Sequence, residues 1–357
     1  MRKWSSLLLS VMLLAAPLAA CSRFYGESTT ATEGNAAART SASVLDKVKN
    51  RGRLNCGVSG ELPGFSYVNQ QGEYSGLDVD VCRALAAAIF DDPNAVEFRN
   101  LNAKERFTAL QAGEVDILSR NTTWTISRDT SVGLEFAPTV FYDGQAMMVK
   151  STSGIKTLKN LEGKSVCVQT GTTTEQNLAD QMRRLGVKYT PIVFEDDNAT
   201  FAAYQQGRCE GVTTDRSGLV SHRSVFPDPD NHIILDEVMS KEPLAPAVSN
   251  GDSRWSDTVK WIVFGLIAAE EYGINSKNIG SFANSQDPEV KRLLGQEGDL
   301  GEGLGLTNDF VVRAVGKVGN YGEIYNRNLG PGTPFDLERG QNALAKNGGL
   351  HYAPPFR

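Results

Sequence analysis

The sequence predicts an α/β protein of two lobes joined by two crossover segments. Strand-like and helix-like segments alternate between residues 53 and 118, the order expected of a largely parallel sheet covered by helices. A second α/β unit of the same kind begins at residue 165. Extended segments near 143–149 and 237–248 link the two units. A chain that crosses twice between two units forms a hinged pair of lobes, in which a few residues absorb the closing motion.

The first unit alternates three strands with helices of about ten residues. Its longest helix, over 76–90, has apolar residues at the 3.6-residue period of an amphipathic helix. Polar loops at 59–64 and 119–128 follow predicted strands, and open α/β sheets bind ligands beyond the carboxyl ends of their strands. The other predicted elements of this unit are helices over 44–50 and 103–111 and strands over 53–58, 96–99, 115–118 and 134–142.

The second unit repeats this alternation, and the chain then returns to the first. Residues 254–272 form a long apolar helix that carries Lys260 and Glu270, so we expect a buried core helix and not a membrane span. The tail from residue 330 is rich in Gly and Pro and is expected to wrap the first lobe. The other predicted elements are strands over 165–169, 190–194, 209–213, 233–236 and 245–248 and helices over 175–185, 199–206, 288–294 and 309–325.

The first twenty residues have the pattern of an export signal. Arg2 and Lys3 precede a short apolar run, and Leu18-Ala19-Ala20-Cys21 places small residues before a cysteine. This tetrapeptide resembles a bacterial lipobox, which predicts cleavage before Cys21 and a lipid on that residue. The alternative is ordinary secretory cleavage with Cys21 as a bystander. The segment that follows is rich in Ser, Thr, Ala and Gly and is expected to act as a flexible tether.

Length and composition are those of an ordinary soluble protein. The 357 residues suffice for two domains, and the formal net charge of −6, without a basic cluster, argues against nucleic acid as a partner. We expect a monomer. The predicted boundaries are a signal peptide over 1–20, the lipidated cysteine and tether over 21–43, the first part of lobe 1 over 44–146, lobe 2 over 147–236, and the hinge return, second part of lobe 1 and C-terminal helical extension over 237–357.

Four further cysteines predict two disulfides. An even number in an exported chain is typical of paired thiols, and sequence alone allows three pairings. We favour Cys56 with Cys82 and Cys167 with Cys209, because each pair then lies within one lobe. Free buried thiols are the alternative. Neither the cysteines nor the three histidines have the spacing of a metal site, and no cofactor is expected.

The loop over 119–128 is the strongest candidate for ligand contacts. It brings hydroxyls, an amide, Trp124 and two arginines between two predicted core strands. Arg128 is the expected carboxylate clamp, because a guanidinium binds a carboxylate through two parallel hydrogen bonds and keeps its charge. The alternative is a solvated loop with ordinary surface arginines.

The second unit offers a matching half-site. Thr172, Thr173 and Thr174 lie where a helix begins, and unpaired backbone N–H groups there suit an anion. Asp215 follows an apolar strand, and its carboxylate could bind an ammonium group. The alternatives are that the threonines only cap their helix and that Asp215 pairs with Arg216 or caps the next helix.

Together these groups are complementary to a zwitterion with an α-carboxylate and an α-ammonium. The space for the ligand side chain would be lined by Leu62, Phe65, Tyr67 and Trp124, although such residues more often belong to a core. The sequence contains neither a Gly-x-Ser-x-Gly nor a His-Glu-x-x-His motif, and no nucleophile–base pair is visible. We therefore predict a binding protein and not an enzyme.

Several segments resemble a known family. The chain resembles the periplasmic amino-acid-binding proteins of ABC uptake systems, most of all the general L-amino-acid-binding proteins, from about residue 45 to the end. This resemblance implies a two-lobed type II periplasmic-binding-protein fold that closes over an amino acid and is then recognised by a membrane permease. The segments that carry it are 54–59, 76–84, 104–116, 119–125, 166–175 and 319–325.

The resemblance also implies roles for individual residues. It implies that Arg128 binds the ligand carboxylate with help from Asn121 and Thr123, that Thr173 contributes donors at the helix start, and that Asp215 takes the ammonium. The chain departs from the family at Leu62, where related proteins have a stacking aromatic residue, and in its apparent lipid anchor. An amino-acid sensor that serves a signalling partner, or a cyclohexadienyl-dehydratase-like enzyme on the same fold, are the alternatives.

Overall fold

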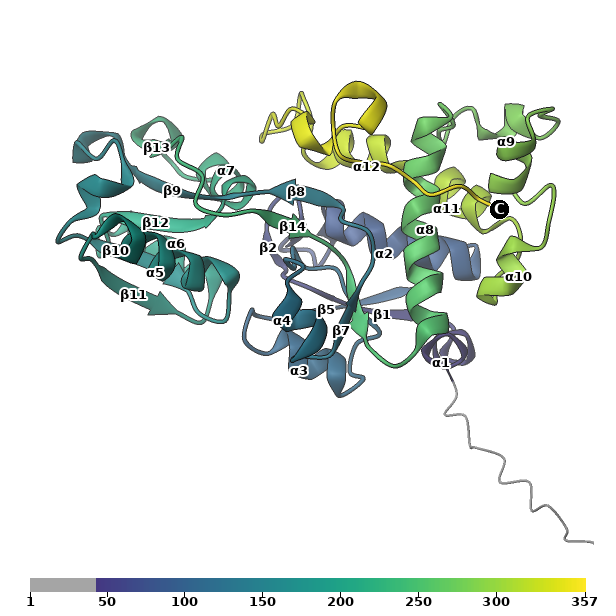
Figure 1. Ribbon diagram of the computed structural model, residues 1–357, viewed down its shortest axis with the longest axis horizontal. Helices are drawn as coiled ribbons and strands as arrows, with labels where there is room; N and C mark the ends of the chain where they lie inside the picture. Colours follow the sequence, from purple (N-terminus) through teal and green to yellow (C-terminus); the bar gives the residue numbers. More distant parts are fainter. Residues whose placement is uncertain (1–42) are drawn as a thin grey trace, which may run out of the picture. The chain divides into compact units, whose positions relative to one another are not determined.

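The computed structural model describes residues 43–357 (Figure 1). The predicted signal peptide, Cys21 and nearly all of the tether lie outside the described residues. No helix within the described range combines the length and the apolar character needed to cross a bilayer.

Lobe 1 is built on a five-stranded sheet of order β5-β1-β6-β15-β7. Strand β1 runs parallel to both of its neighbours, whereas β15 runs antiparallel to β6 and β7. Strand β15 belongs to the segment that returns from lobe 2. The sheet of lobe 1 therefore combines strands that precede lobe 2 in the sequence with one that follows it. The strands are β1 (Leu54–Val58), β5 (Val96–Asn100), β6 (Ile117–Leu118), β7 (Leu134–Phe136) and β15 (Ala247–Ser249), with a small antiparallel sheet of β2 (Glu61–Leu62), β3 (Ser66–Val68) and β4 (Tyr74–Ser75); the helices are α1 (Val44–Arg51), α2 (Leu77–Phe90), α3 (Arg106–Gln111) and α4 (Ile126–Thr130).

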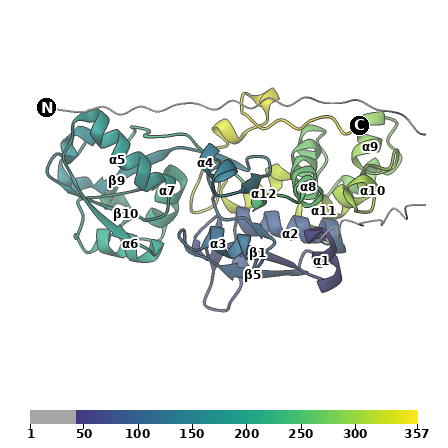
Figure 2. The ribbon, with the colours of Figure 1, turned by 60° about the horizontal axis from the view of Figure 1, so that its bottom comes forward.

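Lobe 2 repeats this plan with a sheet of order β11-β10-β12-β9-β13. Separate apolar clusters fill its two faces, one formed with α5 and the other with α6 and α7, and Figure 2 shows α5 and α6 on opposite sides of the strands. The elements are β9 (Gln145–Lys150), β10 (Ser165–Gln169), α5 (Thr173–Leu185), β11 (Thr190–Phe194), α6 (Asp197–Gln205), β12 (Gly211–Asp215), α7 (Arg216–Ser224) and β13 (His232–Ile234), with 3-10 turns at Ser151–Ser153, Leu158–Leu161 and Pro229–Asn231.

Two antiparallel strands connect the lobes. They are β8 (Phe141–Asp143) and β14 (Glu242–Leu244), which pair with each other in the middle of the view in Figure 1. The two predicted crossovers therefore form one two-stranded ribbon. The structure confirms the two-lobed α/β fold predicted from the sequence.

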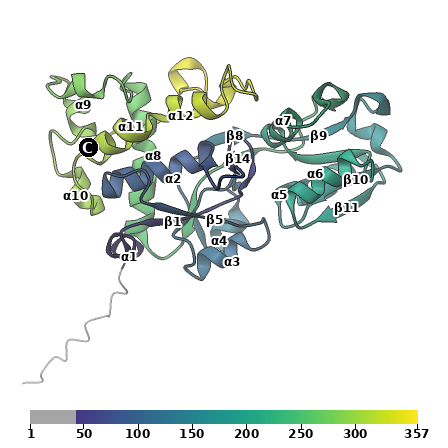
Figure 3. The same ribbon diagram turned by 180° about the vertical axis from the view of Figure 1, so that it is seen from behind.

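The C-terminal extension packs on lobe 1 and reaches the ribbon. Figure 3 shows its helices grouped around α8 on the side of lobe 1 away from lobe 2. Asn342 accepts a hydrogen bond from the Tyr142 N–H (2.6 Å) and donates one to the Tyr142 carbonyl (3.1 Å), so the tail binds the backbone of β8. The helices are α8 (Ser253–Glu271), α9 (Pro288–Leu293), α10 (Leu300–Leu304), α11 (Phe310–Val318) and α12 (Tyr321–Asn328), with 3-10 turns at Ile279–Phe282, Gly340–Asn342 and Ala345–Asn347.

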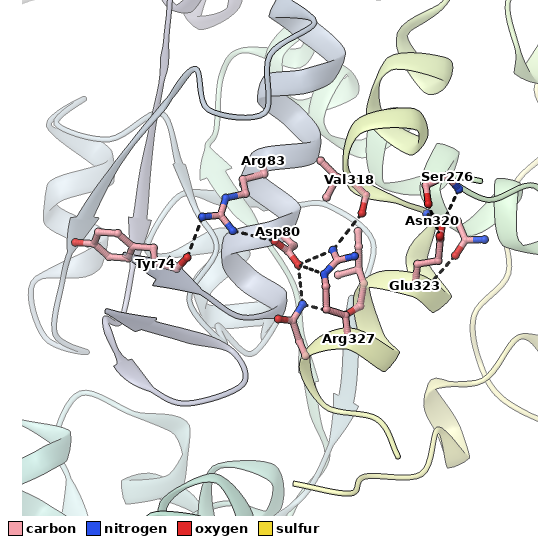
Figure 4. Close-up of polar contacts among 10 residues, drawn as sticks. Tyr74, Asp80, Arg83, Ser276, Val318, Asn320, Glu323 and Arg327 are labelled. Carbon is pink, nitrogen blue, oxygen red and sulfur yellow. Dashed lines mark hydrogen bonds and ion pairs between the residues drawn. The ribbon is translucent and has the colours of Figure 1, made fainter. Parts of the chain in front are cut away.

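The single helix predicted over 309–325 is wrong, because two helices occupy this region. Gly319 separates them in a left-handed conformation (φ 107°) that favours glycine. Asn320 then caps α12 through a capping box with Glu323, which also accepts two hydrogen bonds from Ser276 (Figure 4). The chain therefore turns sharply where an apolar period alone suggested continuity.

A buried carboxylate fixes α12 against α2. Asp80 accepts hydrogen bonds from Arg327 (2.7 Å) and Asn328 (2.7 Å) and forms an ion pair with Arg83 (3.2 Å), as Figure 4 shows. Arg83 in turn donates to the Tyr74 carbonyl (2.9 Å). Because the carboxylate is almost fully buried, its partners hold the extension in one place on lobe 1.

The predicted disulfides are confirmed. Cys56 on β1 is bonded to Cys82 on α2, and Cys167 on β10 is bonded to Cys209 just before β12. Each bond therefore lies within one lobe. The sequence separations are 26 and 42 residues.

Removal of either disulfide should lower stability substantially. We expect the Cys167→Ala/Cys209→Ala double variant to lose about 2 to 4 kcal/mol of unfolding free energy, because an open loop of this length gives the unfolded chain more conformational entropy. Urea unfolding monitored by circular dichroism measures this change, with the reduced wild-type protein as the matched comparison. Equal midpoints for oxidised wild type and the double variant would contradict the expectation.

Candidate ligand-binding site

A polar cavity lies between the two lobes, next to the connecting ribbon. Of its lining residues, all in the described part of the chain, Leu62 alone has an apolar side chain, so the cavity suits a polar or charged ligand. Lobe 1 contributes Ser59, Leu62, Arg106, Arg120, Asn121 and Thr123, and lobe 2 contributes Gln169, Thr172, Thr173, Thr174, Asp197, Thr214, Asp215 and Gly218.

Asp78 on α2 holds the lobe 1 binding loop. Its carboxylate accepts hydrogen bonds from the Asn121 N–H (3.0 Å) and the Ser119 hydroxyl (3.4 Å). Asn121 has a left-handed backbone (φ 36°), and the Oδ1 of its side chain has no partner among the described residues. Burial raises the pKa of Asp78 to about 6, while the hydrogen bonds from the loop oppose this shift. The sequence analysis did not identify this support.

Arg128 lies on a short helix and not in a loop. The prediction of a continuous loop over 119–128 is therefore wrong at its end, because Thr125 caps α4 by accepting the Arg128 N–H (3.3 Å). The guanidinium donates to the Thr123 carbonyl (2.6 Å) and lies behind this residue, so it does not line the cavity directly. Burial lowers the pKa of Arg128 to about 10, partly offset by Glu242 and Asp215, so the group keeps its charge.

Two further buried arginines, Arg106 and Arg120, line the cavity. Arg106 lies at the first turn of α3, with its guanidinium 4.7 Å from the Phe107 ring centre, and the same ring lies 5.1 Å from the Arg128 guanidinium. Arg120 follows β6 and donates through Nε to the Leu101 carbonyl (2.7 Å). Burial lowers the pKa of both side chains. Neither arginine was predicted as a ligand contact from the sequence, although both lie in segments that carry the family resemblance.

The threonines of lobe 2 begin α5. Thr172 is the N-cap and accepts the Glu175 N–H (3.1 Å), so its side chain serves the helix, which was the simpler interpretation of this residue. Thr173 and Thr174 occupy the first helical positions, where backbone N–H groups have no partner within a helix. Gln145 on β9 supports this turn by donating to the Thr174 carbonyl (2.9 Å).

Asp215 is a buried carboxylate with no hydrogen bond in the described structure. It makes no cap bond to α7, and Arg216 donates instead to the Leu235 carbonyl (3.1 Å), so both alternative roles suggested by the sequence are wrong. Oδ1 is fully buried without a partner. Burial, with the neighbouring carboxylates of Asp143 and Glu242, raises the pKa of Asp215 well above its ordinary value. A cation placed beside this group would reverse that shift.

Glu242, on the connecting strand β14, links the two lobes. Its Oε2 accepts hydrogen bonds from the hydroxyls of Thr123 in lobe 1 (2.6 Å) and Thr173 in lobe 2 (2.9 Å). Its Oε1 accepts from Asn177 of α5 (2.7 Å) and from Ser240 (2.5 Å). The side chain is almost completely buried. No pattern in the sequence singled out this residue, because its partners lie far away along the chain.

The three aromatic residues predicted near the ligand lie outside the cavity lining. Phe65 is buried in the core of lobe 1 against Phe141, and Trp124 is 42% exposed and stacks on Phe136. Tyr67 lines a separate surface groove. The placement of these rings in the ligand space is therefore wrong, whereas Leu62 does reach the cavity. Phe65 lies in the core because its ring gains more from burying apolar area than from lining a charged site.

The lobes touch each other around the cavity. At its rim, Lys104 of lobe 1 forms an ion pair with Glu195 of lobe 2 (2.6 Å), and Ser221 donates to the Pro63 carbonyl (2.8 Å). The two lobes are therefore in direct contact at the rim of the cavity. Residues 43–357 contain no group of three or more His, Cys, Asp or Glu side chains positioned to hold a metal ion.

The model of the bacterial extracellular solute-binding proteins, family 3, matches residues 54–294. The chain belongs to this family. The family match ends before α10, so the last helices and the tail form an addition to the common fold.

Relatives extend the similarity over nearly the whole chain. The general L-amino acid-binding periplasmic protein AapJ of Rhizobium johnstonii is 50% identical over 323 residues, which cover 90% of this chain and 95% of the relative. The glutamate/glutamine/aspartate/asparagine-binding protein BztA of Rhodobacter capsulatus is 48% identical over 94% of this chain and 99% of its own. A solved periplasmic binding protein from Brucella ovis with glutathione bound is 52% identical, with a TM-score of 0.86, and covers 89% of this chain and 100% of its own.

Proposed function

We propose that this protein captures L-amino acids in the cavity between its lobes and delivers them to the permease of an ABC transporter. The unpartnered, buried carboxylate of Asp215 is the observation that carries this proposal. A buried charge without a partner is costly, and the α-ammonium of an amino acid is a cation of suitable size. AapJ and BztA are named as amino-acid-binding proteins, which agrees with this ligand class.

The opposite charge of the ligand would be bound beside Arg128. The guanidinium is buried near Asp215, and the N-terminus of α5 faces the same cavity. A carboxylate there would accept bonds from Arg128 and from the free N–H groups of Thr173 and Thr174. Because a zwitterion carries its two charges on one carbon atom, it can satisfy both ends of this site at once.

The hydroxyls of Thr123 and Thr173 contribute through their lone pairs. Each already donates its hydrogen to Glu242, so each can only accept a hydrogen bond from the ligand. Neither hydroxyl is then available to donate to a ligand carboxylate, which differs from the role that the family resemblance implied. An ammonium group donates three hydrogen bonds and accepts none. Glu242 therefore orients these hydroxyls for a cation, which adds to the selection for the amino end of the ligand.

Binding would stabilise the closed arrangement. Arg128, Asn121 and Thr123 belong to lobe 1, whereas Thr173 and Asp215 belong to lobe 2, so the ligand completes its contacts only when the lobes meet. A ligand that binds one arrangement better shifts the population toward it. The permease would then recognise the closed form.

We further propose that the protein acts as a monomer, without a cofactor and without catalysis. A lipid on Cys21 would hold it at the periplasmic face of a membrane, and the Ser/Thr/Ala-rich tether would let the lobes reach the permease. The general L-amino acid-binding relative is described as periplasmic, which agrees with this location.

Calorimetry with single amino acids tests the proposal. We expect the exported full chain, purified in mild detergent and freed of ligand by mild unfolding and refolding, to bind several L-amino acids one to one, and D-enantiomers at least about tenfold more weakly. Product analysis after incubation with a cyclohexadienyl acid serves as the control for catalysis. A folded sample that binds no amino acid, or that converts the acid, would refute the proposal.

A further inference from the structure

We infer that the cavity contains a second anion subsite, formed by Arg106 and Arg120, and that the preferred ligands are α-amino acids with a second carboxylate. This inference rests on the proposed function and specifies its substrate class. The subsite would bind the far end of the ligand while Arg128 and Asp215 bind the α-carboxylate and α-ammonium.

Two buried guanidinium groups line the cavity and a third, that of Arg128, lies behind the lining, all without an ion pair among the described residues. Arg106, Arg120 and Arg128 are only 3%, 4% and 6% exposed, and none has a carboxylate oxygen within 4.0 Å among the described residues. The acids closest to Arg120 are already engaged, since Asp197 is bound to His222 (2.8 Å) and Asp78 holds the binding loop. Buried charges in proteins are normally paired, so these groups are suited to anions from outside the chain.

Arg106 lines the cavity and has donors without a close partner among the described residues. Its Nε is fully buried and has no hydrogen-bond partner, and its NH1 makes only long contacts with the Arg120 carbonyl (3.5 Å) and Thr122 Oγ1 (3.4 Å). The Phe107 ring packs against the guanidinium and restricts its position. A guanidinium that is fixed in place with a free Nε can bind a carboxylate through two parallel bonds.

Arg120 provides a second set of donors on the same wall. Its only hydrogen bond in the described structure uses Nε, toward the Leu101 carbonyl (2.7 Å), so the terminal nitrogens remain available. The Arg120 carbonyl also accepts from Arg106, which places the two residues side by side. Both line the cavity.

Charge matching then selects a dicarboxylic ligand. A simple zwitterion offers one anionic group and can satisfy Arg128, but it leaves Arg106 without an acceptor. A second carboxylate supplies that acceptor. An apolar side chain would meet Leu62 and otherwise polar groups, so it would gain little from burial and would leave donors unpaired.

Two kinds of molecule share this chemistry. Free acidic amino acids carry the second carboxylate on a short side chain. A γ-glutamyl peptide such as glutathione has the same free α-ammonium and α-carboxylate at one end and a second carboxylate at the other, and glutathione is bound in the similar Brucella ovis protein. The separation between the subsites decides which kind fits, and the binding experiment includes both.

Calorimetric titration of the full chain with L-glutamate, L-aspartate, glutathione, L-glutamine and L-leucine tests the inference. We expect at least one dicarboxylic ligand to bind about tenfold or more tightly than L-glutamine, which has nearly the same shape as L-glutamate but is neutral at this end. A higher affinity for glutathione than for L-glutamate would identify a peptide ligand, and the reverse order a free amino acid. Either order of the two affinities supports a second anion subsite, provided that the dicarboxylic ligand binds more tightly than L-glutamine.

Variants assign the effect to the two arginines. Arg106→Gln and Arg120→Gln should each weaken the dicarboxylic ligand by about 30-fold or more and change L-glutamine binding by less than about threefold, because the α-amino-acid contacts remain. Arg106→Lys should restore part of the loss. Arg53→Gln, an exposed arginine on the far side of lobe 1 that pairs with Glu97, is the matched control.

The outcomes separate this inference from the proposed function. Equal loss of L-glutamate and L-glutamine in Arg106→Gln would overturn the inference and leave amino-acid binding intact as a function. Equal affinity of the wild-type protein for charged and neutral ligands would also overturn it, and that measurement needs no variant. Binding of no amino acid by folded wild-type protein would overturn the proposed function itself.

Discussion

Arg128→Ala should abolish measurable binding of every amino acid that the wild-type protein binds, with the dissociation constant rising at least about 1,000-fold. The substitution removes the charge proposed to meet the α-carboxylate, which all amino acids share. It also removes one of the positive charges that offset the repulsion between Asp215 and Glu242. Calorimetry with several ligands measures the effect.

The design of the variants separates binding from folding. Arg128→Lys keeps the charge but loses the two-bond geometry, so we expect it to recover only part of the affinity. Arg53→Ala on the surface of lobe 1 serves as the control, and thermal melting of each variant verifies folding. If Arg128→Ala were folded and bound L-glutamine with unchanged affinity, the α-carboxylate would have to bind elsewhere, and Arg106 would be the first candidate.

Local patterns in the sequence predicted the elements that frame the site. The alternation of apolar strands with amphipathic helices gave the two lobes, because the periods of 2.0 and 3.6 residues follow directly from backbone geometry. Asp215 was identified from its place after a strand, and Thr172 from its place before a helix. These patterns depend only on residues that are close together in the sequence, so a single sequence is enough to recognise them.

The residues that hold the site together were missed because their partners are distant in the chain. Glu242 contacts Thr123 and Thr173, which are 119 and 69 residues away. Asp78 supports a loop 43 residues further on. No local pattern marks such contacts. The break before α12 is different: Asn320 and Glu323 have the spacing of a capping box, so the sequence contained a signal that the apolar period concealed.

The directions of the aromatic side chains could also be found only from the structure. Phe65 and Trp124 lie in segments that approach the cavity, yet their rings point into the core and onto the surface. Sequence position gives the location of a residue on an element, whereas the direction of its side chain depends on strand register and local turns. The sequence alone therefore did not show that charged and polar side chains, and not aromatic ones, line the cavity.

Glu242→Ala is expected to weaken amino-acid binding by at least about 100-fold, because the side chain connects both lobes at the cavity. The alanine would leave the hydroxyls of Thr123 and Thr173 without their common acceptor and would free Asn177. The hydroxyls would then rotate freely, so their lone pairs would no longer be fixed toward the ligand ammonium. Calorimetry measures the loss, and small-angle X-ray scattering with and without ligand measures closure.

Glu242→Gln distinguishes the role of the charge from that of the shape. The amide keeps the size of the side chain. In the wild-type protein, four groups donate hydrogen bonds to the Glu242 carboxylate. The amide NH₂ is itself a donor, so hydroxyls beside it must rotate in order to accept a hydrogen bond from it. We expect affinity to fall about tenfold or more while the melting temperature changes little, since removing this charge also relieves repulsion with Asp143 and Asp215. Glu97→Gln, on the exposed edge of lobe 1, is the control. A variant with normal affinity and a lower melting temperature would show that Glu242 stabilises the fold without orienting the binding hydroxyls.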